Sequence, residues 1–164
     1  MSDEPRDRIR PVCRNREVFH HYEVLDRFEA GLVLLGSEVK SLRAGRGSLD
    51  EAYIRFEGSE AWLVGAHIAP YPQANRMNHE PRRPRKLLLH AREALRLAIR
   101  ARERGLTVVP ISLYFKGPWL KIEIGLGRGK KLHDKRAAIK ERQDLRDMER
   151  DARQRGRGDT GSGR

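Results

Sequence analysis

The order of strand-like and helical segments constrains the fold of this chain more than any other feature. Two hairpin patterns stand out, because each joins two stretches rich in β-branched and aromatic residues through a short turn. The first runs through residues 51–68 and turns at Gly58-Ser59. The second runs through residues 107–125 and turns at Lys116-Gly117-Pro118. Both hairpins predict antiparallel strands.

Two helical patterns interrupt the strands. Residues 37–44 predict a short helix, and residues 90–104 place apolar side chains on one face of a longer one. A further strand-like stretch, residues 19–35, precedes both. The order has no regular βαβ alternation, which disfavours a doubly wound parallel sheet. We expect a β-rich mixed α/β fold, a small antiparallel OB-like barrel with peripheral helices and a basic C-terminal tail.

Apolar residues are concentrated in the middle of the chain, and this divides it into three parts. Residues 1–14 are charged and contain two prolines, so we expect a flexible leader. We expect residues 15–127 to form the barrel. Residues 128–164 form the basic tail, in which twelve Lys or Arg and six Asp or Glu fall between residues 128 and 158. So polar a segment buries little apolar surface, and we expect it to be disordered alone and helical on a partner.

A large excess of positive charge narrows the choice of partners. Thirty-five Lys and Arg against 23 Asp and Glu leave a formal charge of +12, which attracts polyanions such as nucleic acid or an anionic membrane. No stretch reaches the ~20 apolar residues of a membrane span, and the first residues lack the apolar core of a signal peptide. We expect a soluble, cytoplasmic protein without a membrane partner.

Patterns that would indicate catalysis or metal binding are missing from the sequence. Cys13 is the single cysteine, which excludes an internal disulfide and a cysteine-based metal site. Residues 125–131 look like a phosphate-binding loop but miss its spacing by one residue, and a flexible hinge explains them better. The six histidines show no HxxxH or HExxH spacing. We expect no enzymatic activity, no cofactor and no metal.

Two basic segments are the candidates for RNA contact. Residues 76–86 belong to a proline-rich loop, and residues 128–136 surround His133, whose ring could stack on an RNA base. Either segment could instead be an ordinary solvated charged surface. The cations proposed to bind phosphate are Arg82, Arg83 and Arg85 in the first segment, and Lys130, Lys131, Lys135 and Arg136 in the second.

Four strings resemble one known family over residues 15–150. They are FEAGLVLLGSEVKSLRAG (28–45), PRRPRKLLLHAREALRLA (81–98), LYFKG (113–117) and GRGKKLHDKRAAIKER (127–142). In their order and spacing they are similar to the SsrA-binding protein family, SmpB, whose members are partners of transfer-messenger RNA. The resemblance implies an OB-like barrel that binds the tRNA-like domain of that RNA, followed by a basic tail.

The resemblance also implies a role in trans-translation, the rescue of stalled ribosomes and the tagging of their incomplete proteins. Alanyl-tRNA synthetase and elongation factor Tu are implied as partners that act through the RNA. The tail is expected to lie in the empty mRNA channel of the ribosome, near the decoding centre of the small subunit, and to become helical there. Two other functions stay open, a generic OB-type translation factor that binds ribosomal RNA and a small nuclease.

Three residues match family positions tied to binding the tRNA-like domain: Glu29, Leu88 and Lys121. Lys121 can contact phosphate directly. Phosphate repels a carboxylate, so Glu29 either accepts a hydrogen bond from the RNA or pairs with a neighbouring Lys or Arg that makes the contact, and we favour the pairing. Leu88 belongs to a triple-Leu run and could simply be core. Trp119 is also open between core and RNA-facing positions, whereas we favour the core for Trp62.

Two further groups match family motifs. Asn15, His20 and Tyr22 follow the family's N-x-x-x-x-H-x-Y pattern, and we expect them near the same surface as Glu29. The tail motif is expected at the decoding centre, with His133 stacked on a ribosomal base. Its residues are Gly129, Lys130, Lys131, His133, Asp134, Lys135 and Arg136.

Overall fold

A computed structural model describes residues 8–103, 105–130 and 132–157. The chain forms two compact units, residues 1–129 and residues 130–164. The first unit contains all the strands that the structure describes and is called the barrel unit below. In the second unit the described residues form one helix. Within the described ranges, no helix combines the length and the apolar character needed to cross a membrane.

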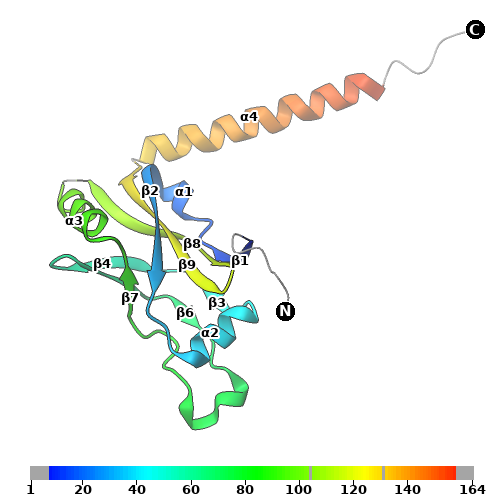
Figure 1. Ribbon diagram of the computed structural model, residues 1–164. Coiled ribbons are helices and arrows are strands. Elements are labelled where there is room, and N and C mark those ends of the chain that lie inside the picture. The colour runs from blue at the N-terminus through cyan, green and yellow to red at the C-terminus, as the bar shows by residue number, and fades with distance from the viewer. Residues whose placement is uncertain (1–7, 104, 131, 158–164) are drawn as a thin grey trace, which may run out of the picture. The chain divides into compact units, whose positions relative to one another are not determined.

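One antiparallel sheet of seven strands forms the barrel unit, in the order β1-β8-β9-β2-β7-β5-β4. It curves like a barrel but is not closed, because β1 and β4 at its two edges do not pair with each other (Figure 1). The expected OB-like antiparallel architecture is confirmed. The strands are β1 (Ile9–Arg14), β2 (Tyr22–Leu32), β4 (Tyr53–Glu57), β5 (Glu60–Val64), β7 (Arg85–Leu88), β8 (Leu106–Lys116) and β9 (Trp119–Gly129), with β3 (Gly47–Ser48) and β6 (His67–Ile68) paired in a separate ladder.

The two predicted hairpins are present. β4 and β5 pair from Tyr53 with Val64 to Glu57 with Glu60, and β8 and β9 meet at the pair of Lys116 and Trp119. The glycine of the second turn, Gly117, has a φ of 59°. Residues with a side chain rarely adopt this left-handed conformation, so the turn requires glycine.

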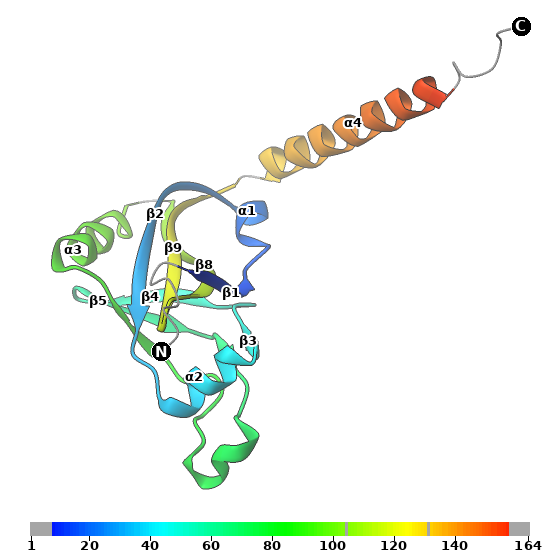
Figure 2. The same cartoon turned by 45° about the vertical axis from the view of Figure 1, so that its right-hand side comes forward.

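Short helices lie at the periphery of the barrel unit. The two predicted helices are confirmed as α2 (Gly36–Arg43) and α3 (Ala91–Arg100), and a helical turn, α1 (Val18–His21), precedes β2. The proline-rich loop of residues 70–84 contains a 3-10 segment, η1 (Pro72–Met77). Both views show this loop next to α2 at one end of the barrel unit (Figures 1 and 2).

Strand β9 shows how the sheet divides core from surface. Ile122 and Ile124 are fully buried, whereas their neighbours Lys121 and Glu123 are partly exposed. This alternation is the period of two that a sheet with one covered face requires. The outer face of β2, β8 and β9 is therefore available for binding.

Strand β2 joins the two halves of the sheet near Gly31. Most of β2 pairs with β9, but Gly31 and Leu32 also pair with β7. A Cβ at Gly31 would lie 3.3 Å from the Cβ of Leu88, so glycine allows the two strands to approach closely. The change of partner strand occurs at Gly31, and the shift in register lies earlier in β2, between Val24 and Asp26.

The flexible leader predicted for residues 1–14 is wrong for its second half. Ile9–Arg14 form β1, which pairs with β8 at the edge of the sheet. Pro11 hides the strand pattern in the sequence. A proline is tolerated on an edge strand, because its missing N–H removes no bond from a central ladder. Residues 1–7 lie outside the described residues.

The basic tail forms α4 (Leu132–Arg157), although we expected disorder in the absence of a partner. Its residues explain the helix, because Ala, Leu, Glu, Gln, Lys and Arg all have high helix propensity. Asp147 and Arg150 also form an ion pair of 3.9 Å one turn apart. The tail was predicted to begin at residue 128. The boundary between barrel and tail lies slightly later, because β9 continues to Gly129.

Candidate nucleic-acid interface

An open hollow of about 630 Å³ lies on the barrel unit beside β2, β7 and the turn between β8 and β9. Glu29, Leu88 and Lys121 all line it. Three different strands supply these residues, and pairing with Gly31 places Leu88 on one side of β2 and Lys121 on the other. The structure therefore brings together three residues that are far apart in the sequence and that only a family resemblance had linked.

Apolar side chains form an exposed part of the hollow. Leu88 is 55% exposed and Trp119 is 69% exposed, so neither belongs to the core. Large apolar groups left in solvent at a concave surface commonly mark a binding site. Trp62, which we favoured as core, is half-buried on β5, and its indole nitrogen is buried. Of the two tryptophans, only Trp119 lines the hollow.

Glu29 pairs with protein groups on the outer face of the sheet. The Tyr114 hydroxyl donates a hydrogen bond to its carboxylate, and Nζ of Lys116 lies 3.5 Å from the other oxygen. The Tyr114 hydrogen bond holds the pKa of Glu29 below its ordinary value against the opposing effect of burial, and Lys116 and Lys121 lower the pKa further. Burial and the bond to Glu29 raise the pKa of Tyr114. Glu29 thus pairs with a cation, as favoured, and the contact of that cation with RNA stays a prediction.

A second ion pair lies on the same face. Nη1 of Arg27 lies 3.0 Å from Oε1 of Glu123, and the Arg27 guanidinium stands over the ring of Phe19 at 5.2 Å. The sequence prediction missed Tyr114 and Lys116. A signal was present, because these residues alternate in the LYFKG string and therefore point to one side of a strand.

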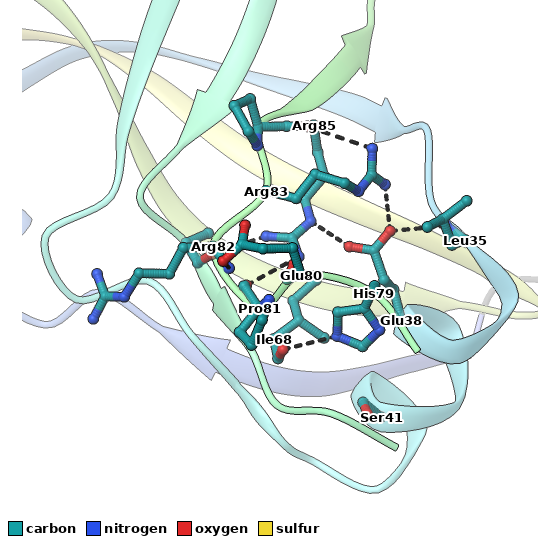
Figure 3. Close-up of polar contacts among 12 residues, drawn as sticks. Leu35, Glu38, Ser41, Ile68, His79, Glu80, Pro81, Arg82, Arg83 and Arg85 are labelled. Atoms are coloured by element: carbon teal, nitrogen blue, oxygen red, sulfur yellow. Dashed lines mark hydrogen bonds and ion pairs between the residues drawn. The ribbon is translucent and has the colours of Figure 1, made fainter. Parts of the chain in front are cut away.

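A buried cluster around Glu38 fixes the base of the loop of residues 70–84. Both Arg83 and Arg85 donate hydrogen bonds to the Glu38 carboxylate (Figure 3). The Leu35 amide donates to the same carboxylate at 2.9 Å. His79 contacts Ser37 Oγ and the Ile68 carbonyl oxygen, each at 2.8 Å, from the neighbouring part of the loop.

The Glu38 carboxyl stays ionised although it is completely buried. Burial alone would raise its pKa, but the Leu35 amide and the guanidiniums of Arg83 and Arg85 outweigh that effect and hold the pKa below its ordinary value. Arg85 is also completely buried and donates a hydrogen bond of 2.8 Å to the Ala66 carbonyl oxygen. Buried charges of this kind persist only when they are paired and hydrogen-bonded.

The prediction that Arg85 contacts RNA phosphate is therefore wrong. Its guanidinium binds Glu38 inside the protein, and the side chain has no solvent exposure. Arg83 is partly accessible to a ligand, because its side chain is 31% exposed although it binds Glu38. Arg82 is exposed and points away from the cluster in Figure 3. Of the three arginines, Arg82 is the one free to reach a ligand.

The chain is similar to proteins of one family along most of its length. The SmpB protein family matches residues 12–154. The SsrA-binding protein of Carboxydothermus hydrogenoformans is 51% identical over 144 residues, which cover 88% of this chain and 97% of that protein. The SsrA-binding protein of Microcystis aeruginosa is 53% identical over 145 residues, covering 88% of this chain and 94% of that protein. The chain belongs to the SmpB family.

A solved structure agrees with this membership. A chain of the structure described as "tmRNA-SmpB: a journey to the center of the bacterial ribosome" is 46% identical to this chain, with a TM-score of 0.63. The match covers 75% of this chain and 87% of that chain. About three quarters of this chain thus share the fold of that chain.

The N-terminal motif of the SmpB family does not lie at the hollow. Asn15 is buried. Its backbone N–H donates to the Ile111 carbonyl oxygen at 2.7 Å, and its side-chain Nδ2 donates to the Leu49 carbonyl oxygen at 3.5 Å. Tyr22 begins β2 and pairs with Gly129, seven residues before Glu29, which is about 23 Å along a strand. Asn15 and Tyr22 thus lie away from the hollow, and a surface shared with Glu29 stays a prediction.

The structure describes the tail residues of the SmpB motif only in part. Gly129 is exposed at the end of β9, Lys130 follows it, and the side chain of Arg136 is exposed on α4. Lys131 lies outside the described residues. His133, Asp134 and Lys135 lie in α4, but their side chains are outside the described part of the structure. Their contacts at the decoding centre stay a prediction.

Proposed function

We propose that this SmpB-family chain binds the tRNA-like domain of transfer-messenger RNA and brings it to stalled ribosomes for trans-translation. The observation that carries the proposal is the hollow, which gathers Glu29, Leu88 and Lys121 on one surface. The SsrA-binding relatives, about half identical over most of their length, support the same partner. The chain acts as a cytoplasmic adaptor with no catalytic step of its own.

The chemistry of the hollow suits folded RNA. Lys121 supplies a charge for phosphate, and the exposed faces of Leu88 and Trp119 suit an unstacked base or a ribose. Glu29 acts through its neighbours, because its carboxylate holds Lys116 and the Tyr114 hydroxyl in place. Such a surface recognises RNA by shape and charge together.

In this proposal the tail binds a second RNA surface, which belongs to the ribosome. Its cations and His133 are proposed to contact the small subunit at the decoding centre and in the empty mRNA channel. Elongation factor Tu and alanyl-tRNA synthetase are proposed to meet the protein through the bound RNA. The division of the chain at Gly129 into two compact units supports this division of labour.

Selective binding tests the proposal. At one fixed salt concentration, the protein should bind transfer-messenger RNA far more tightly than a bulk tRNA of matched size. Lys121→Gln should weaken that binding roughly tenfold, as expected for a lost hydrogen bond between a charged donor and phosphate. Arg102→Gln, an exposed residue outside the hollow, is the matched control. Equal affinities for the two RNAs would instead indicate a generic factor that binds ribosomal RNA.

Truncation separates the two units. A chain ending at Gly129 should keep its affinity for the tRNA-like domain but lose tagging on stalled ribosomes in a translation assay. Loss of RNA affinity on truncation would contradict the assignment of the tail to the ribosome. Incubation of the RNA with the full chain and Mg²⁺ should leave the RNA intact, and cleavage that EDTA abolishes would reveal a nuclease.

A further inference from the structure

Two exposed cations on α2 differ from those on the outer face of the sheet. Arg27 and Lys116 on the sheet are each paired with a glutamate. Lys40 and Arg43 on α2 form no ion pair with any carboxylate in the part of the chain that the structure describes. They stand over aromatic rings instead, with Lys40 Nζ 5.5 Å from the centroid of Tyr71 and Arg43 Cζ 5.1 Å from that of Phe115.

The difference matters for binding an anion. A carboxylate holds a cation in place and offsets part of its charge, whereas an aromatic face holds the cation through its quadrupole and leaves the net charge available. Lys40 and Arg43 are thus held against aromatic faces, and no carboxylate among the described residues offsets their charge. A cation that is already held in place can bind a phosphate with little loss of side-chain entropy.

Helix α2 lies between the hollow and the loop of residues 70–84. On one side Val39 lines the hollow. On the other side Ser41 Oγ donates to the Ala69 carbonyl oxygen at 2.6 Å, next to the start of the loop. At 100° per residue, Lys40 and Arg43 fall on the exposed ridge between these two sides. The views in Figures 1 and 2 agree that the loop follows directly beyond α2.

The loop continues the line of unpaired positive charge. Arg76 and Arg82 are exposed, and neither forms an ion pair within the described ranges. The loop is held in shape at its base, where Tyr71 N donates to Asn78 Oδ1 at 3.0 Å and Asn78 Nδ2 donates to the Tyr71 carbonyl oxygen at 2.8 Å. The charges are therefore presented on a supported loop.

We propose that the RNA seated in the hollow continues across α2, where Lys40 and Arg43 bind its phosphates, and reaches Arg76 and Arg82 on the loop. The inference rests on the proposed function, because it extends the footprint of the same RNA. It makes the ridge of α2 a backbone-reading element, which contributes affinity and orientation while the hollow contributes selectivity.

The salt dependence of binding tests this footprint. The variant Lys40→Gln/Arg43→Gln is compared with Arg96→Gln/Arg102→Gln, which removes the same charge from exposed positions outside the hollow and the ridge. Each phosphate contact contributes about 0.7–0.9 to the slope of log affinity against log salt, so the ridge variant should lower the slope by about 1.4–1.8. Its affinity for transfer-messenger RNA should fall roughly tenfold or more at ~0.1 M salt, and the control should change little.

Each outcome decides between the two proposals. An unchanged slope for the ridge variant, or equal losses for both double variants, overturns the ridge contact. Restored affinity in Lys40→Arg/Arg43→Lys, which keeps both charges, supports it. If the unaltered chain itself fails to prefer transfer-messenger RNA over tRNA, the proposed function fails, whatever the variants do. If tRNA and transfer-messenger RNA lose affinity equally on the ridge change, the ridge reads backbone without selectivity, as proposed.

Discussion

Two glutamates of the barrel unit each hold two side-chain donors, and their surroundings give them different roles. Glu38 is fully buried and binds Arg83 and Arg85. Glu29 has a side chain that is 38% exposed, and it binds Tyr114 and Lys116 beside the hollow. The number of donors is the same, so the difference in role comes from burial.

Burial decides what removal of each carboxylate costs. Beneath the protein surface, an unpaired guanidinium loses both water and partner, and the penalty is several kcal/mol. At the surface, water and salt replace the lost partner, and exposed pairs contribute about 0–1 kcal/mol. Glu38 is thus a structural residue, whereas Glu29 is free to serve recognition.

Glu38→Gln should have the largest effect on stability. Removing the charge leaves two guanidiniums without a counter-ion, and we expect the free energy of unfolding to fall by about 3–5 kcal/mol. Urea denaturation followed by circular dichroism measures the loss. Glu57→Gln is the matched control, because it breaks the exposed Arg55–Glu57 pair of 3.0 Å and should cost no more than about 1 kcal/mol. Equal losses would contradict the role of burial.

Acid should remove the contribution of Glu38 selectively. Its pKa in the folded state lies below the ordinary value of 4.5, so the unfolded chain binds the proton more readily. The stabilisation is fully present above pH 4.5 and is lost as the pH falls through the lowered folded pKa. The difference in Tm between the unaltered chain and Glu38→Gln should therefore shrink on acidification. A constant difference down to the acid transition would show that the charge is not responsible.

Glu29→Gln should leave stability almost unchanged and alter binding. The amide no longer attracts Lys116, and it is a weaker acceptor for the Tyr114 hydroxyl. We expect the preference for transfer-messenger RNA over tRNA to fall roughly tenfold, the equivalent of about 1.5 kcal/mol for one charged hydrogen bond. Competition binding with both RNAs measures the ratio. A large loss of folding stability with an unchanged ratio would make Glu29 structural, like Glu38.

The smallest effect on folding is expected at Arg82. Arg82→Gln removes an exposed side chain that forms no ion pair within the described part of the chain, so the free energy of unfolding should stay within about 0.5 kcal/mol. Arg85→Gln, three residues further on, should destabilise by several kcal/mol because it leaves Glu38 buried with one partner fewer. Thermal denaturation of the two variants side by side measures this contrast. Similar Tm values would mean that the buried cluster is not rigid.

The sequence predicts those parts of the barrel that depend on local pattern. The hairpins follow from glycine turns between β-rich stretches, and α3 follows from its apolar face. The burial of Arg85 does not follow, because its partner Glu38 lies 47 residues away and no local pattern links them. The PRRPRK string looks like a uniform basic loop, although Arg83 and Arg85 bind Glu38 and Arg82 forms no ion pair with any residue that the structure describes.

The candidate site shows the same limit. Lys121 and Glu29 alternate with buried neighbours, so their exposure was predictable from strand period. The exposure of Leu88 was not, because it follows Leu87, which is buried, and only the pairing of β7 with β2 shows which of the two faces solvent. Strand β1 was missed because Pro11 interrupts its pattern. Its place depends on the edge of β8, which is about a hundred residues away.

The hydrogen bond from the Leu35 amide to Glu38 has a consequence for local opening. One carboxylate joins the first turn of α2, the end of the loop and the start of β7, so none of the three can detach while the others keep their contacts. Their amide protons should exchange with solvent as one cooperative foldon, with a shared opening free energy. The ridge that carries Lys40 and Arg43 would then be as rigid as the strand behind it.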